Sequence, residues 1–289
     1  MVEVPVIRVR FIALTASLLS LASLMMRANA SVAPVRLYAM DCGWMDVGDM
    51  GRLFSDTGEY AGEPGRIADP CFLIRHPNGL LLWDAGLGDR ISENKDGVDM
   101  PAFGTRLTVP RTLADQLASL DIKASDITYL AFSHFHLDHT GNAGLFSSAQ
   151  WIVNNAELAT AEETPLSPGL DPAFADAVKR ARKTVIAGDH DVFGDGSVWI
   201  RQTPGHTPGH QSLEIRLEHA GTVLLTGDLY HLRNNRTLGL VAAVNYNRAA
   251  TLASIDRFER IAKNTNARVV IQHDAADFLA LPRFPLYVD

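Results

Sequence analysis

Residues 133–141 read Ser-His-Phe-His-Leu-Asp-His-Thr-Gly, and they follow an apolar run that predicts a buried strand. In an extended chain, alternate side chains project to the same side, so His134 and His136 can bind one metal ion together. Asp138 and His139 come where the chain is expected to turn, so they can face a second metal ion nearby. Imidazole and carboxylate groups suit zinc, with iron, manganese or cobalt as alternatives. This stretch therefore predicts a site for two divalent metal ions at the end of a strand.

Three later apolar segments end on a histidine or an aspartate in a similar way. The residues at these ends are His206, Asp228 and His273. Glycines and prolines surround His206 and favour a tight turn that presents one histidine inward. One such ending carries little information, but three of them after the first motif predict that the side chains meet at one centre.

These segments resemble the metallo-beta-lactamase superfamily, whose H-x-H-x-D-H motif matches residues 134–139. The resemblance extends from about Leu80 to His273 and implies an α+β fold, an αββα sandwich of two central sheets flanked by helices. Asp84 resembles a residue that orients the ligand loop from behind the metal ligands. The resemblance assigns His134, His136 and His206 to the first metal, Asp138, His139 and His273 to the second, and Asp228 to both.

A site of this kind predicts metal-assisted hydrolysis. Two metals that share Asp228 also share a water, whose pKa falls to about 7, so that hydroxide can attack a carbonyl over the first metal. Asp138, or a water, can return the proton. Tyr230 is a candidate for hydrogen bonding to a substrate carbonyl or oxyanion, with aromatic packing as the alternative, and His231 is a candidate for lining the cleft. There is no G-x-S-x-G segment to supply a serine nucleophile.

Residues 130–142, 203–212 and 225–230 resemble the N-acyl homoserine lactonase group, which implies a lactone, in particular an N-acyl-homoserine lactone, as the substrate. One alternative is another ester or thioester metallohydrolase of the glyoxalase II type. A second is an iron-dependent oxygenase or redox protein on the same scaffold, although redox members usually carry Glu where this chain has His136. The net charge is -7 with no basic block, so a nucleic-acid partner is not expected.

The first 30 residues have the pattern of a secretory signal. Arg8 and Arg10 precede the uncharged run Phe11–Met26, and Ala28-Asn29-Ala30 supplies small residues for cleavage. We expect residues 31–289 to form one hydrolase domain that is periplasmic or secreted and has no stable membrane association after cleavage. A membrane anchor is the alternative, but the run is short for a span of roughly 20 residues.

The chain has two cysteines, Cys42 and Cys71, near the ends of predicted neighbouring strands. They either form a disulfide in an oxidising compartment or remain as buried thiols, and the sequence does not choose between these states. We expect two long segments, Asp41–Ala68 and Ile91–Pro110, to be loops that cover the cleft and determine the acyl preference.

Overall fold

The computed structural model describes residue 1 and residues 34–289, and the part from Pro34 to Asp289 forms one compact unit. Apart from Met1, the expected signal segment and its cleavage point lie outside the described residues. Within the described part of the chain, no helix is both long enough and apolar enough to cross a membrane.

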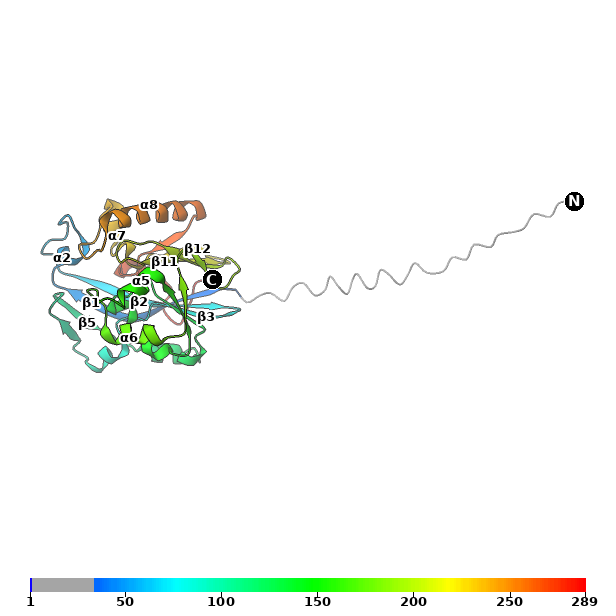
Figure 1. Cartoon of the computed structure of the whole chain (residues 1–289), viewed down its shortest axis with the longest axis horizontal. Helices are drawn as coiled ribbons and strands as arrows, with labels where there is room; N and C mark the ends of the chain where they lie inside the picture. The colour runs from blue at the N-terminus through cyan, green and yellow to red at the C-terminus, as the bar shows by residue number, and fades with distance from the viewer. Residues whose placement is uncertain (2–33) are drawn as a thin grey trace. The chain divides into compact units, whose positions relative to one another are not determined.

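Two sheets form the centre of this unit (Figure 1). The strands of the larger sheet are β1 (Arg36–Val47), β2 (Gly65–His76), β3 (Gly79–Trp83), β4 (Val98–Met100), β5 (Thr105–Thr108), β6 (Tyr129–Ala131), β7 (Gln150–Asn154) and β8 (Lys183–Ile186). Those of the smaller sheet are β9 (His190–Asp191), β10 (Val198–Gln202), β11 (Gln211–Leu217), β12 (Gly221–Leu225) and β13 (Arg268–Val270). Their orders are β4-β5-β1-β2-β3-β6-β7-β8 and β13-β12-β11-β10-β9.

Helices cover the outer faces of both sheets, with α8 on one side and α6 on the other (Figure 1). The α-helices are α2 (Gly51–Phe54), α3 (Leu113–Ala118), α4 (Leu137–Thr140), α5 (Asn155–Thr160), α6 (Pro172–Arg180), α7 (Arg233–Leu238), α8 (Arg248–Thr265) and α9 (Ala275–Leu279). Short 3₁₀ turns add η1 (Asp89–Glu93), η2 (Ala124–Asp126), η3 (Ala143–Phe146) and η4 (Gly227–Leu229). Polar caps begin several helices, as where the Asn247 side chain accepts from Ala250 N at the start of α8.

Alternation along the strands builds three apolar layers. On β2, Phe72 packs between the two sheets, whereas Leu73 faces the layer that contains α3 and α6. On β12, Leu224 packs outward against Phe258 of α8. The result is helices, sheet, sheet and helices in order, which confirms the expected αββα sandwich.

The two segments expected to be loops are partly strands. β1 continues to Val47 and β2 begins at Gly65, so only the middle of 41–68 is irregular. The segment 91–110 contains β4 and β5, and β5 pairs with β1 from Trp44 to Val47. Glycine and charged residues hide these short strands from a sequence reading. Inward-facing Met45 and Leu107 nevertheless give them a shared apolar side.

Candidate metal centre

The predicted ligands converge at one edge between the sheets, each just beyond the carboxyl end of a strand. The first motif follows β6, and the later ligands follow β10, β12 and β13. The structure brings all of them together: His134, His136, Asp138, His139, His206, Asp228 and His273.

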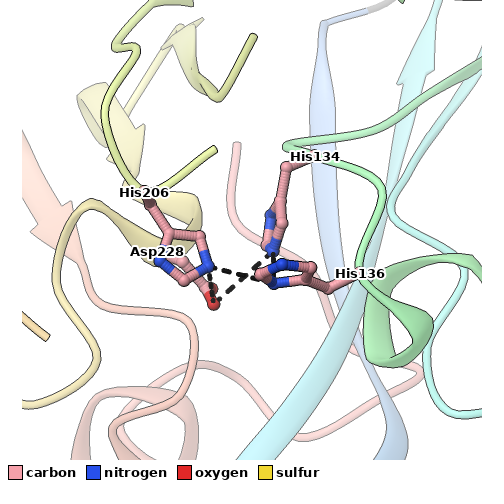
Figure 2. Close-up of side chains that lie close together, drawn as sticks. All are labelled: His134, His136, His206 and Asp228. Atoms are coloured by element: carbon pink, nitrogen blue, oxygen red, sulfur yellow. Dashed lines mark hydrogen bonds and ion pairs between the residues drawn. The ribbon is translucent and has the colours of Figure 1, made fainter. Parts of the chain in front are cut away.

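One group contains three imidazoles and a carboxylate (Figure 2). His136 Nδ1 lies 2.9 Å from His134 Nε2 and 3.1 Å from His206 Nε2. Asp228 Oδ2 lies 3.3 Å from His206 Nε2. Burial lowers the pKa of His134 and of His206 well below the usual range, so both rings are neutral and offer lone pairs.

A second group lies on the other side of Asp228. Its Oδ1 atom is 3.3 Å from His139 Nε2 and 3.0 Å from His273 Nε2. Asp138 Oδ2 is 3.7 Å from each of these two nitrogens. Asp228 thus directs one oxygen to each group, which is the arrangement that a bridging carboxylate requires. Asp69 also belongs to this second group, although no sequence motif singles it out.

Several buried atoms of the second group have no partner in hydrogen-bond geometry in the described structure, even where they lie close to one another. They are Asp69 Oδ2, His139 Nε2, Asp228 Oδ1 and His273 Nε2. Buried polar atoms are normally satisfied, because leaving one unpaired costs about 1–3 kcal/mol. A divalent cation would satisfy all of these atoms at once, and the donor types are those that zinc, iron, manganese and cobalt accept. The residues therefore fit two divalent cations.

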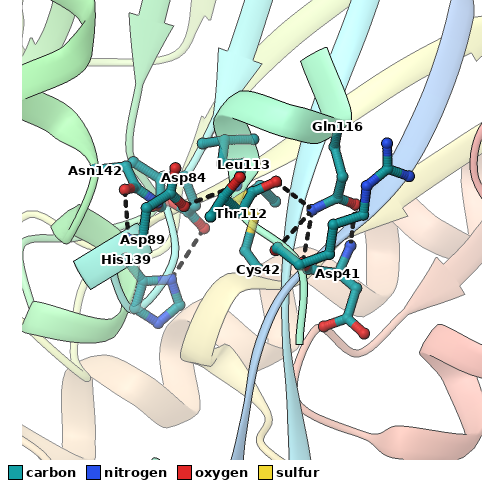
Figure 3. The surroundings of a disulfide bond; sticks show 12 residues. Asp41, Cys42, Asp84, Asp89, Thr112, Leu113, Gln116, His139 and Asn142 are labelled. Atoms are coloured by element: carbon teal, nitrogen blue, oxygen red, sulfur yellow. Dashed lines mark hydrogen bonds and ion pairs between the residues drawn. A yellow bond between two sulfur atoms is a disulfide. The ribbon is translucent and has the colours of Figure 1, made fainter. Parts of the chain in front are cut away.

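Asp84 supports the ligand loop from behind, as its resemblance to an orienting residue implied. Its Oδ1 accepts from Ser133 N at 2.6 Å. Its Oδ2 lies 3.0 Å from His139 Nδ1 (Figure 3). This contact holds the His139 ring with Nε2 toward the centre.

A disulfide joins Cys42 and Cys71 beside the same loop, which excludes the alternative of free thiols.

Glu157 is a positioning residue that the sequence did not reveal. It lies in α5, is fully buried, and joins two ligand loops through its carboxylate. One oxygen accepts from Phe135 N at 2.9 Å, between two of the ligands, and the other accepts from Gly209 N at 2.9 Å. Burial raises the pKa of Glu157, while these hydrogen bonds act in the opposite direction.

His210 positions the bridging carboxylate. The sequence alone did not separate this function from an ordinary structural role. Its Nδ1 donates to Thr203 O at 2.9 Å, and its Nε2 accepts from Asp228 N at 2.8 Å. Burial lowers the pKa of His210 to about 4, so the ring is neutral and this pattern assigns its proton to Nδ1. The left-handed Gly227, with φ +55°, allows the close approach, because a Cβ there would meet His210 Nε2 at 2.6 Å.

The structure corrects the expectation for Tyr230. Its side chain is buried against Phe258, and its hydroxyl donates to Glu259 at 3.0 Å, away from the metal ligands. His231 takes the position at the centre instead, with Nε2 3.0 Å from Asp228 Oδ2. Tyr230 has extended backbone angles, so consecutive side chains point to opposite sides and only the second reaches the cleft.

Comparison with known proteins agrees with this geometry. The profile described as Metallo-beta-lactamase superfamily matches residues 65–273. The chain belongs to this superfamily. An N-acyl homoserine lactonase AttM from Rhizobium radiobacter is 31% identical to this chain. The match covers 86% of this chain and 98% of the AttM protein. An N-acyl homoserine lactonase from Bacillus sp is 29% identical over 78% of this chain and 90% of its own length.

A solved structure extends the comparison to three dimensions. It is an N-acyl homoserine lactone hydrolase with the product N-hexanoyl-L-homoserine bound at its catalytic metal centre. It has a TM-score of 0.75 and 25% identity, and the match covers 88% of this chain and 98% of that chain. The resemblance to the metallo-beta-lactamase superfamily, stated above on the histidine motif, is therefore confirmed.

In this superfamily member, an apolar cavity opens onto the ligands. Its polar end contains His136, Asp138, His206, Asp228, His231 and His273. Most of the remaining lining is apolar and comes from the β1, β2, β4–β5 and α2 regions: Met45, Val47, Leu53, Phe54, Ile67, Met100, Phe103 and Leu107. The two segments expected to be loops thus supply the apolar side chains that line the approach to the ligands.

Proposed function

We propose that this protein is a two-metal lactonase that opens N-acyl homoserine lactones. The observation that carries the proposal is the continuity between the histidine and aspartate cluster and the apolar cavity. An acyl chain fits an apolar lining, while the lactone ester needs the polar end. The names of the relatives and the product bound in the solved neighbour support the same substrate class.

We assign one cation to His134, His136 and His206, and the other to Asp138, His139 and His273. Asp228 serves both, since its two oxygens face opposite groups. When bound, such metals supply Lewis acidity and lower the pKa of water to about 7. Zinc suits this donor set, with iron, manganese or cobalt as alternatives.

The chain's own side chains then hold the substrate and move a proton. Asp138 borders the cavity and its side chain is 18% exposed, so its carboxylate is accessible to a water and to the substrate. Asp138 accepts a proton from the attacking water. It returns this proton to the ring oxygen as the bond between the carbonyl carbon and the ring oxygen breaks. The product is an N-acyl homoserine. His231 Nε2 faces the same space and is placed to hydrogen-bond a substrate oxygen, the task first expected of Tyr230.

The second candidate is a thioesterase, because a thioester presents a similar carbonyl to the same centre. Purified protein is assayed with N-decanoyl homoserine lactone and with a glutathione thioester, beside Asp228→Ala and the exposed control Asp176→Ala. We expect the lactone to have a kcat/KM at least a hundredfold higher, loss of turnover in Asp228→Ala, and wild-type rates in the control. Turnover of the thioester without ring opening would refute the lactonase assignment in favour of the thioesterase.

We also propose that the protein is exported and acts as residues 31–289. The disulfide between Cys42 and Cys71 supports an oxidising compartment. Sequencing the N-terminus of protein recovered from the periplasm or medium should give Ser31. An intact Met1 in a membrane fraction would support an anchor instead.

A further inference from the structure

Asp69 lies in the interior of β2, where no motif marks it as functional. Its neighbour Ala68 is bonded twice to a proposed ligand: Ala68 N donates to His273 O at 3.1 Å, and His273 Nδ1 donates to Ala68 O at 2.7 Å. The register of β1 and β2 shifts between Asp41 and Trp44, opposite Asp69. The strand is thus locally irregular where it meets the metal centre, and its backbone fixes Asp69 beside His273.

The carboxylate of Asp69 is aimed into the second group. The residue is 1% exposed, and its Oδ2 has no hydrogen-bond partner in the described structure. One atom from each of Asp69, Asp138, His139 and His273 lies within 4.8 Å of the others. An unpaired carboxylate in the interior is costly, and it persists where a cation or a hydrogen-bond donor compensates it. No arginine or lysine supplies that charge among the ion pairs of the described residues.

The two metal positions then differ in their donors. The first has three imidazole nitrogens and one oxygen of Asp228. With Asp69, the second has two imidazole nitrogens and oxygens from three carboxylates. Manganese and iron(II) prefer oxygen-rich sites with five or six donors, whereas zinc is commonly bound by four.

We propose that Asp69 is a ligand of the second metal position, which makes this position richer in carboxylate than the first and suited to a cation of high coordination number. The inference rests on the proposed two-metal function, and it adds a ligand to that centre. Its consequence is that loss of Asp69 weakens one metal selectively.

The test uses the protein loaded with Mn²⁺ and dialysed against increasing chelator, with bound metal counted by mass spectrometry. We expect two ions per wild-type chain, and we expect Asp69→Asn to lose one of them at a chelator concentration at least tenfold lower. Asp138→Asn should lose the same ion, and the exposed Asp176→Asn should match the wild type. Retention of the other ion at the wild-type chelator concentration shows that the isosteric variant is folded.

A Co²⁺-loaded sample gives a second readout, because cobalt absorbs more strongly in the visible as its coordination number falls. Asp69→Asn should therefore absorb more per bound ion than the wild type, whereas a carboxylate that only stabilised the fold would leave the spectrum unchanged.

Two ions with wild-type retention in Asp69→Asn, or simultaneous loss of both, would overturn the role of Asp69 alone. A wild-type protein that binds fewer than two ions would overturn the two-metal centre itself. Selective loss without lactone turnover in the wild type would leave Asp69 as a ligand and remove the lactonase assignment.

Discussion

Glu157→Gln tests whether the two ligand loops depend on one buried carboxylate. Glutamine has nearly the same shape but offers a single acceptor oxygen. The glutamate accepts from Phe135 N and from Gly209 N, both at 2.9 Å, so one of these bonds must be lost. The side-chain amide nitrogen then faces a backbone N–H, which is a contact between two donors in the protein interior.

The expected cost follows from the kind of bond that is lost. A hydrogen bond to a charged group contributes about 1.5–3 kcal/mol. Part of this loss is offset, because the variant no longer buries a charge whose pKa is raised by desolvation. We therefore expect a decrease of about 2 kcal/mol in the free energy of unfolding, a roughly 30-fold change in the folding equilibrium. Metal affinity should fall about tenfold or more, because Phe135 lies between two ligands and Gly209 lies in the turn that carries His206.

Urea unfolding at a fixed zinc concentration measures the first effect, and chelator competition measures the second. Glu162→Gln is the matched control, since Glu162 is exposed just beyond the same helix, and it should remain within about 0.5 kcal/mol of the wild type. A Glu157→Gln protein with wild-type stability and wild-type metal affinity would refute the reasoning.

Three further changes probe other parts of the structure. Asp84→Asn should weaken metal binding about 10–100-fold in chelator competition, because the amide no longer fixes the His139 ring as a carboxylate does. Replacing Cys42 and Cys71 with serine should lower the free energy of unfolding by about 3–4 kcal/mol in denaturant titrations, as expected for a sequence separation of 29 residues. Asp189→Asn should cost about 1 kcal/mol at pH 7 after solvent screening, and the difference from the wild type should shrink in urea titrations as the pH falls below the unfolded pKa of about 3.9.

The sign of the Asp189 effect comes from its neighbours. Burial alone would raise the pKa of this carboxyl, but hydrogen bonds from Arg257, Gln202 N and Arg201 outweigh it and lower the pKa. A lowered pKa stabilises the folded protein above the unfolded value of about 3.9, and this contribution is lost as the pH falls further. A pH-independent difference would contradict this account. Unchanged metal affinity in Asp84→Asn, or unchanged stability in the cysteine variant, would contradict the other two.

The sequence could predict the convergence of the main ligands because each follows an apolar strand. His206 and Asp228 are far from the first motif along the chain. The strands β10, β12 and β13 run in the same direction within the smaller sheet, so the residues that follow their carboxyl ends lie at the same edge. Asp69 could not be found in this way, because it lies within β2 rather than after it, and because His273, which belongs to the same ligand group, is distant in sequence. Contacts of this kind depend on strand register, which a single sequence does not specify.

The reason that His231, and not Tyr230, faces the metal centre is local. One residue of difference in an extended segment reverses the side to which a side chain points. Both residues lie within three positions of Asp228 in the sequence. Packing separates them, because the Tyr230 hydroxyl donates to Glu259 and its ring packs against the apolar face of α8. The strands β4 and β5 were missed for a different reason: they are three and four residues long and contain charged side chains.

The most direct test of the central claim is ring opening of N-decanoyl homoserine lactone by metal-depleted protein during titration with zinc. Because Asp228 faces two groups of ligands, the account predicts that activity rises to a plateau at two equivalents per chain. Full activity at one equivalent, or activity that does not depend on added metal, would contradict a bridged two-metal lactonase.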